Sequence, residues 1–170
     1  SPGACSLADH IALYEAGLKF DLEKVDLKSH KLEDGSALSE VSPKNYVPVL
    51  KLDDGEILTE NVAILAYIAD LAPALIPPGP LGPYRLLEML AYSSTEIHKS
   101  VAPRVHGAPG REKRQAIAAI AKRLDYVAKV FKGPHLFGEK ATVADAYLFV
   151  MLLWAERNKL PIPELLPAFA

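Results

Sequence analysis

The sequence predicts a two-part chain in which an α/β segment is followed by an all-helical segment. Strand-like and helix-like patterns alternate as far as Leu71, whereas only helical periodicity follows Tyr84. Between them, five prolines and two glycines crowd positions 73–83, a density that interrupts regular structure. We therefore expect domains at 1–76 and 84–170, joined by a Pro/Gly-rich linker at 77–83.

The α/β segment opens on a predicted helix from Ser6 to Ala16, which carries one apolar stripe. Ser6 and Asp9 have the spacing of a capping box, with Asp in place of the usual Glu. Phe20 to Leu27 alternates imperfectly, which predicts a strand with a kink or bulge. A further strand before residue 1 would complete a βαβ unit.

A hairpin and a second helix are predicted after a polar, turn-prone stretch at 28–42. Two short apolar runs, 47–52 and 57–59, flank an Asp-Asp-Gly turn, which is typical of antiparallel strands. Pro48 lacks a backbone N–H and belongs at the start of its strand. The helix is expected at 61–71, with Asn61 or Glu60 at its N-cap.

The second segment contains three predicted helices. Their apolar residues recur at helical spacing over 84–104, 111–132 and 144–158. Thr142 and Asp145 have the spacing of a capping box just before the third helix.

Composition excludes several classes of function. The net charge is −2 with acids and bases mixed along the chain, so neither a nucleic acid nor a membrane surface is expected as partner. A single cysteine excludes an intrachain disulfide and a cysteine-cluster zinc site, and it suits a reducing cytoplasm. The histidines show no metal-ligand spacing, so no metal is expected. The chain starts with Ser rather than Met, and its last residues, 167–170, resemble the middle of a longer sequence, so we expect missing residues at both ends.

Cys5 is the most informative single residue. A thiol near a helix N-terminus lies among unpaired N–H groups, which favour the thiolate and lower the pKa. Ser6 beside it is placed to donate a hydrogen bond to an anionic sulfur. The alternative is a buried cysteine that packs as a small hydrophobe. Without a Cys-x-x-Cys motif, a dithiol reaction within the chain is excluded.

Two further segments have the chemistry of a peptide-binding site. A cis bond between Val47 and Pro48 would turn the backbone of Val47 outward, so that a peptide-like ligand pairs with it. The alternative is an edge-strand proline in the ordinary trans form. Glu60 and Asn61 precede a helix whose N–H groups suit a carboxylate, and their side chains suit an ammonium group. Simple helix capping is the alternative there.

His98 lies on the first helix of the second segment, in the run Thr95-Glu96-Ile97-His98-Lys99. A lone histidine is more often a surface or satisfied core residue than a catalyst. The charged run 111–114 is interpreted as a solvated helix face.

Together these motifs resemble the bacterial beta-class glutathione S-transferases. The matching segments occur in order along nearly the whole chain: Ser1-Pro2-Gly3-Ala4-Cys5-Ser6-Leu7, Val47-Pro48, Leu58-Thr59-Glu60-Asn61-Val62-Ala63-Ile64, Thr95-Glu96-Ile97-His98-Lys99 and Val143-Ala144-Asp145-Ala146-Tyr147. The resemblance implies a thioredoxin-like N-terminal domain, an all-helical C-terminal domain, glutathione as co-substrate and a homodimer.

The resemblance also implies roles for individual residues. Cys5, helped by Ser6 and His98, would face the glutathione sulfur. Glutathione itself would be held by the backbone of Val47 beside cis-Pro48, by Glu60 and Asn61 at its γ-glutamyl end, and by Thr95 and Glu96, which would contact the ligand of the partner subunit. Two positions depart from the family: His30 stands where a lysine is usual, and Ala91 where an asparagine is usual. Lys31, next to His30, is the alternative to that lysine.

Three functions follow from these expectations. The first is a detoxifying transferase that conjugates glutathione to small apolar electrophiles, with a second-substrate pocket near Lys99 and Trp154. The second is a glutathione-dependent thiol-disulfide or peroxide reductase in which Cys5 is the nucleophile. The third is a glutathione-binding scaffold without turnover.

Overall fold

The computed structural model describes residues 3–101 and 110–160, apart from the side chains of residues 101, 112, 113 and 116. Outside the described residues lie Ser1, Pro2, His106 and residues 161–170. The last part of the helix expected at 84–104 also lies outside them. The α/β part contains α1 Leu7–Glu15, β1 Val25–Asp26, β2 Lys31–Leu32, α2 Leu38–Val41, β3 Val49–Lys51, β4 Ile57–Thr59 and α3 Asn61–Leu71. The helical part contains η1 Pro73–Leu75, α4 Gly82–Tyr92, η2 Ser93–His98, α5 Lys99–Val101, α6 Gly110–Val130 and α7 Val143–Arg157.

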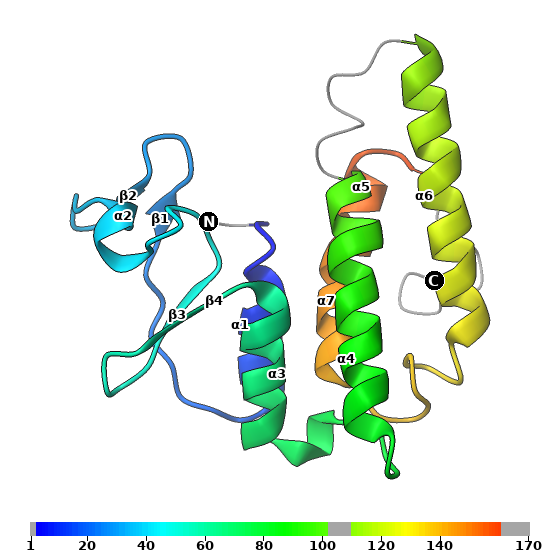
Figure 1. Ribbon diagram of the computed structural model, residues 1–170, viewed down its shortest axis with the longest axis horizontal. Coiled ribbons are helices and arrows are strands. Elements are labelled where there is room, and N and C mark those ends of the chain that lie inside the picture. The colour runs from blue at the N-terminus through cyan, green and yellow to red at the C-terminus, as the bar shows by residue number, and fades with distance from the viewer. Residues whose placement is uncertain (1–2, 102–109, 161–170) are drawn as a thin grey trace.

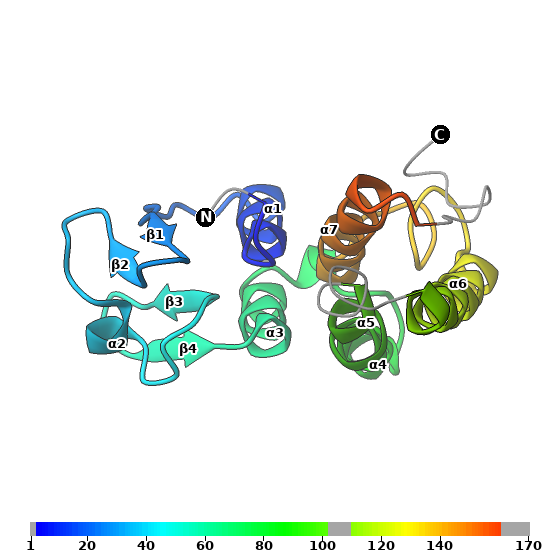
Figure 2. The ribbon, with the colours of Figure 1, turned by 90° about the horizontal axis from the view of Figure 1, so that it is seen from above.

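The elements form successive layers from one end of the molecule to the other. Strands and α2 lie at one side, α1 and α3 stand side by side next to them, then come α4 and α7, and α6 covers the far side (Figures 1 and 2). The α/β part and the all-helical part expected from the sequence are therefore both present. They meet where α1 packs against α7.

The hairpin and the helix after it form where the sequence predicts them. β3 and β4 are antiparallel, with Leu50 opposite Leu58, and Gly55 at the turn has a φ of 91°, which favours glycine. α3 occupies the expected residues. Its N-cap is Glu60, because Asn61 is already the first helical residue.

The strand expected over Phe20 to Leu27 is mostly absent. Only Val25 and Asp26 pair, with Lys31 and Leu32 of β2. The other residues have no neighbouring strand to exchange backbone hydrogen bonds with, which a regular strand requires. The two ladders are separate among the described residues. The polar stretch at 28–42 contains β2 and α2, because Leu32 and Leu38 are buried against Val25 there.

The capping box expected at Ser6 does not form. Ser6 has helical backbone angles and makes no capping hydrogen bond, whereas an N-cap side chain accepts from the helix only when its backbone is extended. Asp9 is instead buried, 5% exposed.

The helix expected from Tyr84 begins two residues earlier, at Gly82 in the last part of the linker. Pro83 stands in the first turn, where its missing N–H costs no hydrogen bond. Close packing also requires Gly82, because a Cβ there would lie 1.9 Å from the carbonyl oxygen of Pro77. The helix then widens into the π-helical turn η2 before α5. Such turns contain more residues than an α-helical turn and occur often at functional sites.

The expected capping box of α7 is confirmed. The backbone N–H and the hydroxyl of Thr142 both donate to Asp145 Oδ2, at 2.8 and 2.7 Å. Asp145 Oδ1 accepts from the backbone N–H of Leu136 at 2.8 Å. One carboxylate therefore fixes both the start of α7 and the loop that leads to it.

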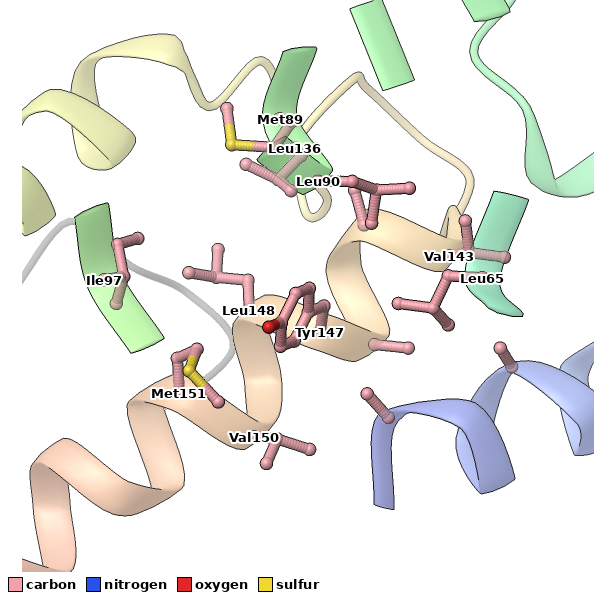
Figure 3. Close-up of a cluster of buried hydrophobic side chains, with 14 of the residues drawn as sticks. Leu65, Met89, Leu90, Ile97, Leu136, Val143, Tyr147, Leu148, Val150 and Met151 are labelled. Carbon is pink, nitrogen blue, oxygen red and sulfur yellow. The ribbon is translucent and has the colours of Figure 1, made fainter. Parts of the chain in front are cut away.

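The main core surrounds α7, most of whose residues are buried. Side chains from α3, α4, η2 and α7 meet there, as Figure 3 shows for Leu65, Leu90, Ile97 and Leu148. Tyr147 lies among them and is 1% exposed, although it carries a hydroxyl group. None of the helices in the described ranges is both long and apolar enough to cross a membrane.

Candidate functional site

Cys5 lies just before α1 and is half-buried. Burial raises the pKa of its thiol to about 11, and the carboxylate of Asp9 acts in the same direction. The backbone N–H groups of Ser6 and Cys5 lower the pKa by less. The expectation that the helix start makes Cys5 a thiolate is therefore wrong, because desolvation has the larger effect. Cys5 is a protonated thiol at neutral pH.

The structure brings Cys5 together with two of the predicted binding residues. Its Sγ lies 3.9 Å from the backbone carbonyl of Val47, and the peptide bond between Val47 and Pro48 is cis. The side-chain amide of Asn61 donates to the carbonyl of Cys5 at 3.1 Å. Asn61 thus reaches Cys5 from α3, and its Oδ1 is buried without a partner.

Glu60 projects from the turn between β4 and α3, where its φ is 75°. Its carboxylate accepts a hydrogen bond from the Tyr46 hydroxyl at 2.6 Å and pairs with Lys44. These two partners hold the pKa of Glu60 below its ordinary value. The charge of Lys99, across on the helical part, acts in the same direction.

His98 comes from the helical part and is held by two aromatic residues of α7. Its Nδ1 lies 2.7 Å from the Tyr147 hydroxyl, and its ring meets Trp154 edge to face at 5.1 Å. Burial and the neighbouring Lys99 lower the pKa of His98, so it is neutral at pH 7. Burial also raises the pKa of Tyr147, which therefore keeps its proton.

Trp154 also fixes the segment that carries Cys5. Its indole N–H donates to the carbonyl of Gly3 at 2.8 Å. Gly3 has a φ of 76°, and a Cβ there would lie 2.7 Å from the guanidinium of Arg157. The turn before Cys5 is therefore held by the end of α7.

Thr95 and Glu96 face other parts of the chain. The Thr95 hydroxyl donates to the carbonyl of Ala91 on its own helix at 3.0 Å. Glu96 pairs with Arg123 of α6 at 2.8 Å. Within this chain they support the helical part.

The two departures from the family pattern lie on the surface. His30 is exposed, and its Nδ1 lies 3.0 Å from the carbonyl of Asn45, two residues before Val47. Lys31 is exposed in β2, and Ala91 is exposed at the end of α4.

A pocket opens away from these residues, between α1, α7 and the loop before α7. Its walls include Ile11, Phe131, Pro134 and Phe149. Neither Cys5 nor the Lys99 and Trp154 expected at the second-substrate pocket lines it. Among the described residues, no three His, Cys, Asp or Glu side chains gather as a metal site requires.

Sequence reasoning gave no role to three residues that shape this site. Lys44 and Tyr46 precede the cis bond and hold Glu60, but nothing in their spacing indicates it. The sequence indicates Tyr147 only as the last residue of the motif Val143-Ala144-Asp145-Ala146-Tyr147. A tyrosine on an otherwise apolar helix face is a usable signal, because a buried hydroxyl needs a partner.

Comparison with known proteins accounts for both parts of the chain. Residues 4–71 match the family model "Glutathione S-transferase, N-terminal domain", and residues 88–170 match "Glutathione S-transferase, C-terminal domain". The chain belongs to the glutathione S-transferase family. The relatives and solved structures agree with this.

This transferase chain is 44% identical over 169 residues to the glutathione S-transferase GstA of Escherichia coli O157:H7. The aligned region covers 96% of this chain and 84% of the relative. The bacterial beta-class glutathione S-transferase of Sphingomonas chungbukensis is 43% identical, with a TM-score of 0.84 over 99% of this chain and 88% of that one. A sphingomonad glutathione S-transferase solved in complex with glutathione is 44% identical, with a TM-score of 0.83 over 94% and 82%. The resemblance to the beta class and the predicted fold class are confirmed.

Proposed function

We propose that this glutathione transferase binds glutathione against Cys5 and Val47 and conjugates it to small apolar electrophiles. The glutathione thiolate attacks an electrophilic carbon, a carbon–sulfur bond forms, and a leaving group such as chloride departs with its electron pair. The relative solved with glutathione supports this choice of co-substrate. The gain in rate comes from proximity and from stabilised charge on sulfur.

The observation that carries the proposal is the burial of the Cys5 thiol, which raises its pKa. A thiol with a pKa of about 11 is a poor nucleophile at pH 7, but it is a hydrogen-bond donor. Donation to the glutathione sulfur favours its charged form. The same observation argues against the reductase, in which the Cys5 thiolate itself attacks.

We assign the remaining roles by position. The backbone of Val47 pairs with the cysteinyl part of glutathione, since its carbonyl faces Cys5. Glu60 offers a carboxylate to the γ-glutamyl ammonium, with Lys44 and Tyr46 holding it in place. Asn61 orients the Cys5 backbone. With Tyr147 donating to Nδ1, His98 carries its proton on Nε2 and donates toward the sulfur.

The first experiment measures conjugation of glutathione to 1-chloro-2,4-dinitrobenzene by absorbance of the thioether. We expect turnover well above the uncatalysed reaction, and Cys5→Ala retains part of it because Cys5 only donates a hydrogen bond. Loss of that bond costs about 1.5–3 kcal/mol, which is roughly 10- to 100-fold in kcat/KM. An absence of turnover across several electrophiles would exclude the conjugating function.

The reductase is tested with the same variant. If Cys5 were the nucleophile, Cys5→Ala would abolish glutathione-dependent reduction of a mixed disulfide, whereas equal rates would exclude that chemistry. The scaffold predicts glutathione binding, measured by calorimetry, with neither activity. Robust turnover in either assay would exclude the function of a scaffold without catalytic activity.

We further propose a cytoplasmic homodimer with domains at 1–76 and 84–170. Exposed apolar side chains follow α3 and α4, where Leu71, Leu81, Tyr84 and Leu87 are each about half exposed or more. Large apolar side chains that gather on an exposed face are typical of a protein interface. Thr95 and Glu96 would then lie near the ligand of the partner subunit, and the reducing cytoplasm supplies glutathione.

A further inference from the structure

Asp9 is a buried carboxyl group without a hydrogen-bond partner. It lies on α1, one turn after Cys5, and is 5% exposed. Neither of its oxygens has a partner. Buried carboxylates are ordinarily paired with a cation or hydrogen-bonded, because an isolated charge in a low-dielectric interior is costly. Asp9 therefore requires an explanation that capping of α1 does not supply.

The residues around Asp9 also surround the sulfur site, by which we mean Cys5 and His98, the two side chains that would face the glutathione sulfur. α1 packs against α3 and α7. From α3, Asn61 reaches the carbonyl of Cys5, and from α7, Tyr147 bonds His98. We call these five residues, Cys5, Asp9, Asn61, His98 and Tyr147, the junction cluster.

The junction cluster contains more acceptors than donors when Asp9 is ionised. Both oxygens of Asp9 and the Oδ1 of Asn61 are buried acceptors without a partner. The Asn61 amide donates to the carbonyl of Cys5 and also to the Tyr147 hydroxyl, which in turn bonds His98. A proton on Asp9 converts one of these acceptors into a donor, and a neutral carboxyl group is cheaper to bury than a charged one.

We propose that Asp9 is a positioning residue of the sulfur site that works as a neutral carboxylic acid, donating its proton to Asn61 Oδ1 and so holding the Asn61 amide against Cys5. Asp9 touches neither glutathione nor the electrophile. Its ionisation would break the bond to Asn61 and place an unpaired negative charge one turn from the sulfur.

The charged and titratable groups around Asp9 favour the neutral form. Cys5 precedes it on the same segment, and Tyr147 faces it from α7; a charge on Asp9 raises the pKa of both. α3 contributes the neutral Asn61, while its carboxylate Asp70 is exposed. Burial alone raises the pKa of Asp9 well above its ordinary value, with no cation to oppose it.

The sign of the pH dependence follows from this raised pKa. Above pH 3.8, the ordinary value for an aspartate, the unfolded chain loses the Asp9 proton while the folded chain keeps it. The folded state then binds more protons, so the free energy of unfolding falls as pH rises until Asp9 ionises in the folded state too. Beyond that point the charge also opposes the glutathione thiolate.

The test compares wild type with Asp9→Asn, whose amide has the shape of a neutral carboxyl group and does not titrate. The matched control is Asp70→Asn, which removes an exposed carboxylate on α3. Urea unfolding at a series of pH values should show a fall in stability with pH that Asp9→Asn removes and Asp70→Asn keeps. Infrared spectra of wild type at pH 7 should show a protonated carboxyl band that is absent from Asp9→Asn.

Activity gives the third readout, and this part rests on the proposed conjugating function. At low pH the two proteins should have similar kcat/KM. At pH values above the titration of Asp9, kcat/KM of Asp9→Asn should exceed that of wild type by up to about tenfold, which corresponds to one pKa unit in the glutathione thiol.

Superimposable stability and activity profiles for wild type and Asp9→Asn would overturn the proposal. If Asp9→Asn does not fold, the infrared spectrum of wild type with ¹³C-labelled aspartate decides, and the absence of a protonated band at pH 7 refutes it. A chain without conjugating activity still yields the unfolding and infrared results. Failure of the proposed function is thereby distinguished from failure of this inference.

Discussion

At the scale of single residues, Cys5 shows two opposing effects on one thiol. Its place at a helix start offers backbone N–H groups that stabilise a thiolate, yet burial has the larger effect and raises the pKa to about 11. The sequence displays the helix start through its neighbours, but it does not display how much water the sulfur loses on folding. The position of Cys5 was therefore predictable, whereas its protonation state was not.

The pKa of Cys5 can be measured directly, because the chain has one cysteine. We expect alkylation by iodoacetamide to be slow at pH 7 and to rise with a midpoint near pH 11 in the folded protein without glutathione. In urea the midpoint should return to about 9, the ordinary value. A folded-state midpoint below 9 would contradict the buried-thiol account and favour the reductase.

At the scale of elements, regular segments with their own start and stop signals were predictable and short ones were not. The hairpin β3–β4 and helix α3 have turn residues and periodicity within a few positions of each other, so local sequence is sufficient. The strand expected at Phe20–Leu27 depends on a second strand to pair with, and the pattern of one segment cannot reveal whether such a strand lies beside it. α2 spans only four residues and is stabilised by burying Leu38.

The capping box of α7 gives a prediction at this scale. Asp145→Ala removes acceptors for the hydroxyl and N–H of Thr142 and for the N–H of Leu136. Because a lost cap costs about 1 kcal/mol and a buried donor without a partner costs about 1–3 kcal/mol more, unfolding in urea should show a loss of about 2–4 kcal/mol.

Asp125→Ala is the matched control for that substitution. Asp125 is exposed on α6, so its loss should change the free energy of unfolding by no more than about 0.5 kcal/mol. Equal effects of the two substitutions would show that the Asp145 bonds do not stabilise the fold.

At the scale of the whole molecule, the two parts are joined by polar bonds as well as by apolar packing. The indole N–H of Trp154, in the helical part, donates to the carbonyl of Gly3, in the α/β part. The sequence predicted the two parts and the break between them. It could not predict the bond between Trp154 and Gly3, since the two residues are far apart in the chain and no single motif contains both.

Trp154→Phe tests the bond to Gly3 while keeping an aromatic ring beside His98. Removing one hydrogen bond should lower the free energy of unfolding by about 1 kcal/mol. We also expect a higher KM for glutathione, because the turn before Cys5 is less firmly held. Tyr126→Phe removes only a hydroxyl group from a side chain that is 43% exposed on α6, and it should leave KM unchanged. An unchanged KM in Trp154→Phe as well would separate this bond from ligand binding.

The dimer is tested by charging its expected surface. Tyr84 on α4 and Tyr14 on α1 are each 70% exposed, so they form a matched pair. Tyr84→Glu should yield monomers in light scattering at micromolar concentration, since a buried unpaired charge opposes association, whereas Tyr14→Glu should remain dimeric. Two dimeric variants would place the interface elsewhere.

The π-helical turn η2 has a consequence for how this helix tolerates length changes. A π-turn is what an α-helix becomes when it accommodates one inserted residue. The residues before η2 and those after it are therefore out of phase with each other by about 100°, the angle that one residue spans in an α-helix. Deleting one residue between Ser93 and His98 would restore a continuous α-helix and rotate His98 away from Tyr147 or Leu90 away from the core. A change of length here would therefore displace either the core residue Leu90 or the site residue His98. With η2 in place, the same helix positions Leu90 in the core and His98 at the site.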